Sequence, residues 1–171
     1  RAVYTDEQSM PVGLLRLWPV QAPHAHAEIV GIDAGAALAL PGVHAVLTAA
    51  DIPGVNNTGP IKHDEPLIPS DRVSYFGQAV AWVVASNMAA ARLAAQQVQV
   101  EYRALPACLS IDQAIAEQRF HMSPSRIVRG DVETALAASA HRLQGEVRCG
   151  GQDHFYLETH ASWVSIDGDG L

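Results

Sequence analysis

The sequence is poor in charged and aromatic residues and contains a single lysine. Charged side chains make up 17% of the 171 residues and aromatic ones 6%, whereas 49% of the residues are hydrophobic. A disordered chain combines low hydrophobicity with high charge, so this composition excludes one. The net charge of −7 offers no basic surface to nucleic acid or to an anionic membrane. We therefore expect a folded protein that binds neither.

Cysteines and long apolar runs are also scarce. Cys108 and Cys149 are too few and too far apart for a Cys-x-x-Cys metal site or a disulfide framework. Two reduced, buried thiols in a cytoplasmic protein are the expectation, with a single disulfide between them as the alternative. No apolar run reaches the roughly 18–20 residues of a membrane span. The polar N-terminus, residues 1–6, does not resemble a signal peptide.

Both ends of the sequence indicate a fragment of a longer protein. The chain begins with Arg1 rather than Met. Residues 161–166 alternate like a strand and lead into Asp167-Gly168-Asp169-Gly170, which favours a hairpin turn over a calcium loop. Only one residue follows that turn, and a strand without its partner is an unnatural stopping place.

Short strands and helices alternate along the chain, which predicts a layered α+β fold. The strand at 79–85 is almost wholly apolar, so we expect it in the centre of a sheet, and the strand at 13–18 should end at Pro19. Residues 55–71 predict an irregular loop and residues 119–130 a linker. Further strands are expected at 28–32, 43–47, 98–102, 142–149, 152–159 and 161–166, and helices at 34–40, 87–97 and 111–118, capped by Asp33, Ser86 and Ser110. A helix at 131–140 should start with Asp131, which lies with Glu133 at the positive end of the helix dipole. Thr48 should cap a single turn, and Ala89, Leu93 and Gln96-Gln97 should form a small-residue packing face on the second helix.

Two local clusters could carry chemistry. In Pro23-His24-Ala25-His26-Ala27, a strand would place both histidines on one face like a metal pair, but no third ligand is specified. We predict that His24 and His26 bind no metal. His63-Asp64-Glu65 could form a titrating group, but its proline-rich surroundings favour a solvated loop tip.

The densest polar pattern is residues 150–160. As a strand, this stretch would place Gln152, His154, Tyr156, Glu158 and His160 on one face, with Phe155 and Leu157 on the other. Gly150 and Gly151 would let a backbone or a ligand approach closely. Such a polar row must face water, a partner or a polar ligand, and the pattern alone leaves these alternatives open.

This stretch resembles the Gly-Gly-Gln-Asp/Glu-His-Phe-Tyr-Leu-Glu signature of the xanthine dehydrogenase/aldehyde oxidase family of molybdenum hydroxylases. Other blocks similar to the family precede this stretch and occur in the same order as in the family, so the resemblance covers nearly the whole chain. They are Pro23-His24-Ala25-His26-Ala27, Ile32-Asp33, Leu40-Pro41-Gly42-Val43, Ala50-Asp51-Ile52-Pro53-Gly54, Asp64-Glu65-Pro66-Leu67, Phe76-Gly77-Gln78-Ala79-Val80-Ala81, and Val100-Glu101-Tyr102 with Leu105-Pro106-Ala107. Asp153 and Thr159-His160 favour the xanthine dehydrogenase members.

The resemblance implies an α/β hammerhead domain at residues 1–107, a helix and linker at 108–130, and the truncated start of a molybdopterin-binding domain at 131–171. It implies a molybdenum–molybdopterin cofactor, with [2Fe-2S] clusters and FAD on a partner domain or subunit. Gln152 matches the family glutamine whose amide donates a hydrogen bond to an oxygen ligand of molybdenum. No catalytic residue and no protein metal ligand is expected within these residues, so the fragment alone should be inactive.

The implied activity of the complete bacterial, cytoplasmic enzyme is oxidation of hypoxanthine and xanthine to urate, with electrons passed through iron–sulfur clusters and FAD to NAD. Its implied partners are a purine substrate, the iron–sulfur/FAD part and further subunits of an oligomeric holoenzyme. The alternatives are an aldehyde oxidase, another aromatic N-heterocycle hydroxylase or a carbon monoxide dehydrogenase relative. A self-standing α+β interaction domain without a redox role is the competing class.

Overall fold

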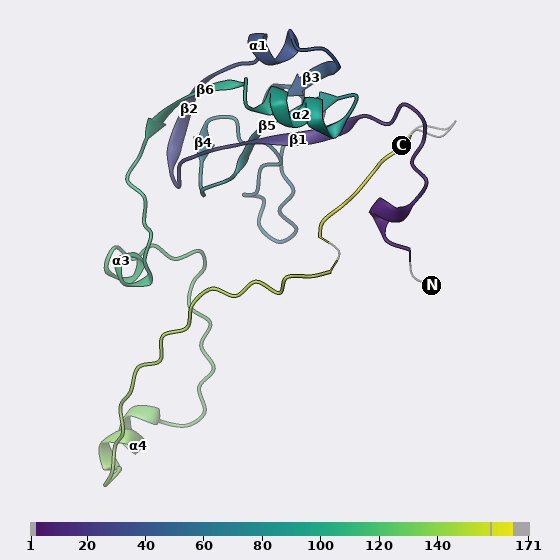
Figure 1. Cartoon of the computed structure of the whole chain (residues 1–171). Helices are drawn as coiled ribbons and strands as arrows, with labels where there is room; N and C mark the ends of the chain where they lie inside the picture. The colour runs from purple at the N-terminus through teal and green to yellow at the C-terminus, as the bar shows by residue number, and fades with distance from the viewer. Residues whose placement is uncertain (1–2, 158, 166–171) are drawn as a thin grey trace. The chain divides into compact units, whose positions relative to one another are not determined.

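Two three-stranded antiparallel sheets organise residues Met10–Glu117, which form one of two compact units of the chain (Figure 1). The second unit combines Arg1–Ser9 with Gln118–Leu171. The computed structural model describes residues 3–157 and 159–165. In these ranges the fold mixes helices and antiparallel sheets, which confirms the expected α+β class.

The first sheet has the order β1-β5-β3, with β1 at Arg16–Gln21, β5 at Ala79–Ala85 and β3 at Val43–Leu47. The apolar strand β5 lies in the centre, as its composition predicts, and Val80, Ala81 and Val83 are fully buried. Pro19 does not end β1 but pairs with Trp82 inside it. That expectation is wrong because β1 is an edge strand, where a residue without an N–H group is tolerated.

The second sheet has the order β4-β2-β6. Strand β2 spans Ala27–Asp33 and lies between the two-residue strand β4, Arg72–Val73, and β6, Gln99–Ala104. The exposure of β6 alternates over its first four residues, as its sequence pattern predicts. Ala27 and Val73, which face each other in the register, are both fully buried and join the same core cluster as β5.

The helices are short, and their capping residues fix where each one begins. Helix α2, Met88–Ala95, packs on β1 and β5, and α1, Gly35–Leu38, packs on β3. Asn87, not Ser86, caps α2, since its Oδ1 accepts from the Ala90 N–H at 2.9 Å. Likewise α1 begins one residue later than predicted, with Ala34 at its cap, although the Asp33 Oδ1 accepts from the Gly35 N–H.

The buried face of α2 differs from the predicted one. Ala91 and Ala94 are fully buried, whereas Leu93 is about half exposed. The small-residue character is confirmed, but the helix is rotated relative to the expected face. Because alanine lacks a long side chain, the helix backbone can approach the sheet closely at these two positions.

Other caps follow the sequence. The Thr48 side chain caps a 3₁₀ turn at Ala49–Asp51, and Ser110 caps α3, Ile111–Ala116, by accepting from the Gln113 N–H. In the second unit, the helix predicted at 131–140 is α4, Val132–Ala138, and Asp131 is its cap rather than its first residue. Thr5–Glu7 forms a further 3₁₀ turn. Among the described residues, no helix is long and apolar enough to cross a membrane.

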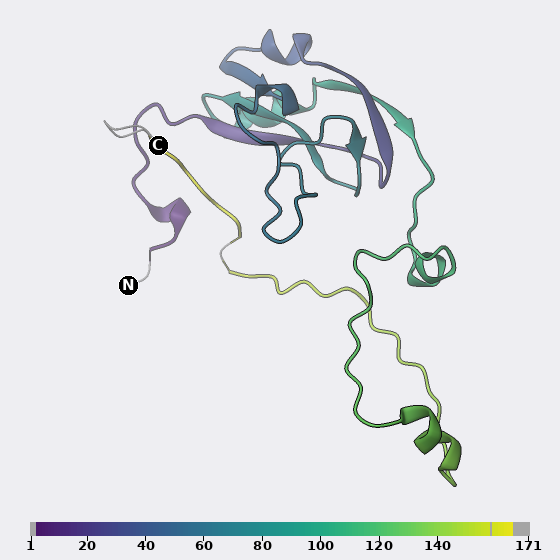
Figure 2. The ribbon, with the colours of Figure 1, turned by 180° about the vertical axis from the view of Figure 1, so that it is seen from behind.

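The three strands expected at 142–149, 152–159 and 161–166 are absent from the described part of residues 142–165 (Figure 2). A strand is stable only when a neighbour satisfies its backbone groups, and here no strand pairs with these residues. Their alternating sequence is therefore present without a sheet, and those three predictions are wrong. Glu158, Ile166 and the turn expected at 167–170 lie outside the described residues.

Candidate functional site

The candidate site, residues 150–157 with 159 and 160, belongs to the second unit and is not a strand. Phe155 adopts a φ of 48°, in the left-handed region, and its N–H donates to the Asp153 Oδ1 at 3.1 Å. This local turn interrupts the two-residue alternation. The predicted division into a polar and an apolar face therefore fails: Phe155 and Leu157 are 89% and 90% exposed.

One element of the predicted polar row is retained. The rings of His154 and Tyr156 stack with centroids 5.6 Å apart and an interplanar angle of 10°. Phe155, the one residue between them, is the residue with the left-handed φ, so the stacked pair belongs to the local turn and not to an extended strand. Gln152 and His160 are exposed, and the structure does not bring them together with this stacked pair.

The residues around Gln152 fit a ligand that needs neutral donors and close backbone access. A Cβ atom added at Gly150 or Gly151 would meet nothing within 4 Å, so the backbone is open there. The exposed Gln152 amide offers two N–H donors without a charge. An oxygen-rich, anionic cofactor would be served by such a donor, whereas a carboxylate in its place would repel it.

Several blocks that resemble the family contact one another in the first unit. His26 Nδ1 lies 2.7 Å from the Pro106 carbonyl oxygen, and the Leu105 N–H donates to the His26 carbonyl at 3.0 Å. The His24 ring packs edge-on against Tyr102, with centroids 5.0 Å apart. The two histidines therefore lie in a turn between β1 and β2 rather than on a strand, and they pack against the end of β6.

A second such contact surrounds Gly77 and Gln78. The Gly77 N–H donates to the Ala22 carbonyl, and the Ala22 N–H donates to the Gln78 carbonyl, each at 2.9 Å. The buried Gln78 side chain accepts from the Ser74 N–H at 2.8 Å. These motif residues therefore hold a turn in place, which is a structural role.

The remaining candidate cluster, His63-Asp64-Glu65, lies in an exposed loop. His63, Asp64 and Glu65 are exposed in the loop at 55–71, and the Glu65 carbonyl accepts from both the backbone and the hydroxyl of Thr58. Across the described residues, no group of three His, Cys, Asp or Glu side chains could hold a metal ion.

Both cysteines are free thiols, but Cys108 is half-buried and Cys149 exposed. The expectation of buried thiols is wrong because each lies outside the two sheets and their core.

Comparison with known proteins places this chain in a family. A model of the aldehyde oxidase and xanthine dehydrogenase a/b hammerhead domain matches residues 1–106, and a molybdopterin cofactor-binding domain model matches residues 115–171. The first match covers more than half of the chain. The chain belongs to the aldehyde oxidase and xanthine dehydrogenase family, as the resemblance of its motifs predicted.

Individual relatives agree with this assignment. The chain is 40% identical over 166 residues to xanthine dehydrogenase of Oryza sativa subsp. japonica, covering 95% of this chain and 12% of that protein. It is 39% identical over 170 residues to aldehyde oxidase 1 of Bos taurus, covering 98% and 13%. The structure of aldehyde oxidoreductase from Desulfovibrio gigas is similar with a TM-score of 0.59 and 40% identity, over 66% of this chain and 13% of that one. The chain thus spans about an eighth of the length of these relatives.

Proposed function

We propose that these residues form part of a molybdenum hydroxylase of the xanthine dehydrogenase type, with the molybdopterin cofactor bound in part by residues beyond the hammerhead region. The observation that carries this proposal is the order of the two family matches together with the Gly150–Leu157 stretch. In the complete enzyme the cofactor supplies the redox chemistry, and the protein positions and polarises it.

We further propose the domain division 1–107, 108–130 and 131–171, with the last range starting the cofactor-binding domain. Gln152 would contact the cofactor by donating an amide hydrogen bond to an oxygen ligand of its metal. Two features support this role: the amide is a neutral donor, and the glycines before it leave the backbone accessible. Within the described residues of this segment, the local turn is formed by Asp153 and Phe155, and the Gln152 side chain is exposed.

The proposed substrate is a purine, which the complete enzyme oxidises to urate. The proposed partner is a domain or subunit that carries [2Fe-2S] clusters and FAD and passes electrons to NAD. The complete enzyme is proposed to be bacterial, cytoplasmic and oligomeric. Asp153 with Thr159-His160 favours this substrate class over aldehydes. The identity to an aldehyde oxidase is close to that of a xanthine dehydrogenase, so overall similarity does not discriminate between them.

Purification of the full-length protein from its native host tests the proposal. Elemental analysis should find molybdenum, and the released pterin should be detected by its fluorescence after oxidation. Xanthine and hypoxanthine should be turned over much faster than benzaldehyde or carbon monoxide. Faster oxidation of benzaldehyde would favour the aldehyde oxidase alternative, and a full-length protein without molybdenum or pterin would favour an interaction domain without redox function.

A further inference from the structure

Arg16, His44 and Ser86 line one pocket near the end of the central strand β5. The His44 Nε2 lies 2.8 Å from the Ser86 Oγ, joining β3 to the residue that follows β5. In the same sheet, Arg16 of the edge strand β1 is paired in register with Ala85, the residue before Ser86. The three residues therefore come from three neighbouring chain segments near the same end of the sheet.

A β-bulge accounts for the position of His44. The register of β3 with β5 shifts between Val43 and Ala45, so His44 has no direct partner across the ladder. A bulge redirects the side chain of its extra residue and often occurs beside a binding site. Here it directs His44 toward Ser86, while Gly42, at a φ of 81°, accepts the Ser86 N–H with its carbonyl at 2.8 Å.

An open surface cavity of about 500 Å³ lies beside these residues, of which His44 and Ser86 are exposed. Arg16, His44 and Ser86 line it, together with an apolar wall made by Met10, Pro11, Gly13, Leu14 and Leu15. The wall follows a turn in which the Leu14 N–H donates to the Pro11 carbonyl and Gly13 has a φ of 81°. No carboxylate lines the cavity, although the chain as a whole has a net charge of −7.

We propose that this cavity binds the carboxylate of a small organic acid with an apolar body. Arg16 is the cationic donor, because the guanidinium fork matches the two carboxylate oxygens. Ser86 is the second donor, and the apolar wall contacts the hydrocarbon part of the ligand. The cavity volume lies in the range of small-molecule sites.

His44 acts as a positioning residue for Ser86. With its proton on Nε2, the imidazole donates to the Ser86 Oγ and leaves the hydroxyl hydrogen free to donate to the carboxylate. With the proton on the other ring nitrogen, the hydroxyl instead donates to His44 and cannot donate to a ligand. Ligand binding should therefore select the first tautomer, which gives His44 a spectroscopic signature.

Nuclear magnetic resonance of the 171-residue chain tests the site. Sodium benzoate is titrated at constant pH and ionic strength while the His44 imidazole signals, assigned with H44Q, are followed. Benzoate should produce a saturable shift, whereas benzyl alcohol, which has the same apolar ring and no charge, should produce none. Inorganic phosphate, an anion without an apolar body, should bind at least roughly 10-fold more weakly, because it makes no contact with the wall.

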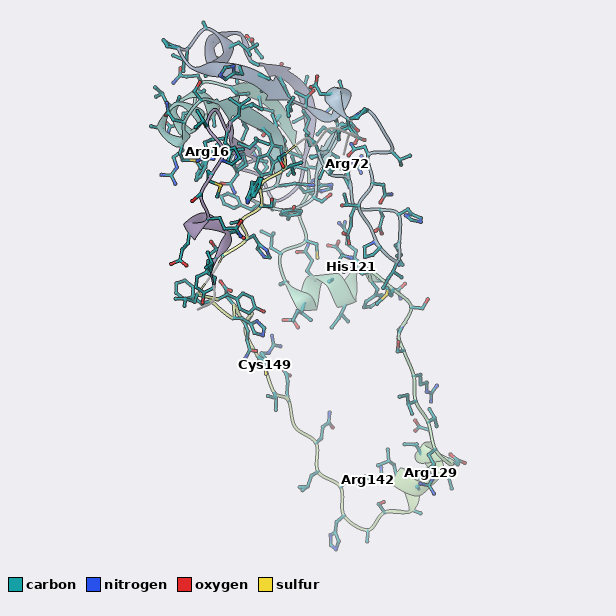
Figure 3. All side chains as sticks on the ribbon, turned by 90° about the vertical axis from the view of Figure 1, so that its right-hand side faces the viewer. Arg16, Arg72, His121, Arg129, Arg142 and Cys149 are labelled. Atoms are coloured by element: carbon teal, nitrogen blue, oxygen red, sulfur yellow. The ribbon has the colours of Figure 1, made fainter. Side chains whose placement is uncertain are left out.

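The variants separate the proposed donors from general charge effects. R16Q and S86A should each weaken benzoate binding by roughly 10-fold or more, since each removes a hydrogen bond to a charged group. R16K keeps the charge and the strand position and should bind with intermediate affinity, so it remains informative if R16Q does not fold. R72Q, on β4 in the other sheet, removes a cation outside the cavity and should bind like wild type (Figure 3).

A linear shift that does not saturate would overturn the proposal. So would unchanged benzoate affinity in R16Q or R16K, or equal binding of benzyl alcohol or phosphate. Because the isolated chain and the His44 signal are used, these outcomes are independent of molybdenum content and turnover.

Discussion

The Asn56 side chain hydrogen-bonds to Ile68 as a neighbouring strand would. Its Nδ2 donates to the Ile68 carbonyl at 2.6 Å, and its Oδ1 accepts from the Ile68 N–H at 3.2 Å and from the Leu67 N–H at 2.9 Å. Ile68 itself is buried. One amide therefore closes the long irregular segment at residues 55–71.

Removing that amide should destabilise the protein. N56A leaves the backbone groups of a buried residue without partners, and we expect a loss of about 2 kcal/mol in the free energy of unfolding. The measurement is urea denaturation followed by tryptophan fluorescence. V55A, which alters a neighbouring side chain that is 88% exposed, should change stability by less than about 0.5 kcal/mol. Equal stabilities of N56A and V55A would show that the loop is held by other contacts.

Substitution of Gly77 should destabilise the protein because of the backbone angle at this position and not because of steric crowding. Its φ is 83°, and a Cβ atom there would meet only the end of the Gln21 side chain, at 3.8 Å. G77A should therefore cost about 1–2 kcal/mol from the left-handed conformation alone. G54A is the control, because Gly54 has open space and no positive φ, and it should be neutral or slightly stabilising. Equal thermal midpoints for the two variants would contradict this account.

The Tyr102 hydroxyl should contribute nothing to stability. Within the described ranges it is a buried oxygen that has no hydrogen-bond partner, and burial raises the pKa of Tyr102. Y102F should unfold at the same or a higher denaturant concentration, with a gain of up to about 1 kcal/mol. Y75F, which alters an exposed hydroxyl, should have no effect. A loss of more than about 1 kcal/mol in Y102F would mean that the hydroxyl has a partner in solution.

The turn after β3 should weaken in acid. Hydrogen bonds from the Thr48 N–H and then from its hydroxyl hold the pKa of Asp51 below the ordinary value of 3.8. Because the folded pKa is the lower one, the stabilisation is complete above pH 3.8 and is lost as the pH falls through the folded pKa. Carboxyl ¹³C titration should show this lowered pKa, and T48V, which keeps the N–H but removes the hydroxyl, should raise it part of the way. An unchanged titration in T48V would assign the shift to the backbone bond alone.

Local sequence patterns predict the first unit well. The bounds of β3 and β5 agree with the apolar runs, and Thr48 and Ser110 cap where their side chains can accept a following N–H. Pro19 within β1 could not be predicted, because its tolerance depends on β1 being at the sheet edge. The choice of Asn87 over Ser86 likewise depends on the fold, in which the Ser86 hydroxyl is engaged by His44.

The candidate site is where sequence and structure differ most. Its alternation predicts a strand, but a strand needs a hydrogen-bonding neighbour, and no other strand pairs with residues 142–165 within the described chain. The left-handed φ of Phe155 depends on a local hydrogen bond to Asp153 that competes with strand formation. The His44 bulge also leaves no signal in the sequence, because it arises from pairing with β5.

The most direct test of the proposed function is turnover per bound molybdenum in the full-length enzyme carrying Q152E. The substitution replaces an N–H donor with an acceptor and adds negative charge beside an anionic cofactor. Losing about 2–4 kcal/mol of transition-state stabilisation corresponds to a roughly 30- to 1,000-fold slower rate. Q152A should be milder because water can donate in place of the amide. A substitution of His160, the control, should have a smaller effect than Q152E.

Metal content and the molybdenum X-ray absorption spectrum of each variant provide a readout besides activity. We expect Q152E to retain its molybdenum, to alter the spectrum of the metal's oxygen ligands and to turn over at least about 30-fold more slowly than wild type. Wild-type turnover by Q152E with a full molybdenum complement and an unchanged spectrum would contradict the role proposed for Gln152.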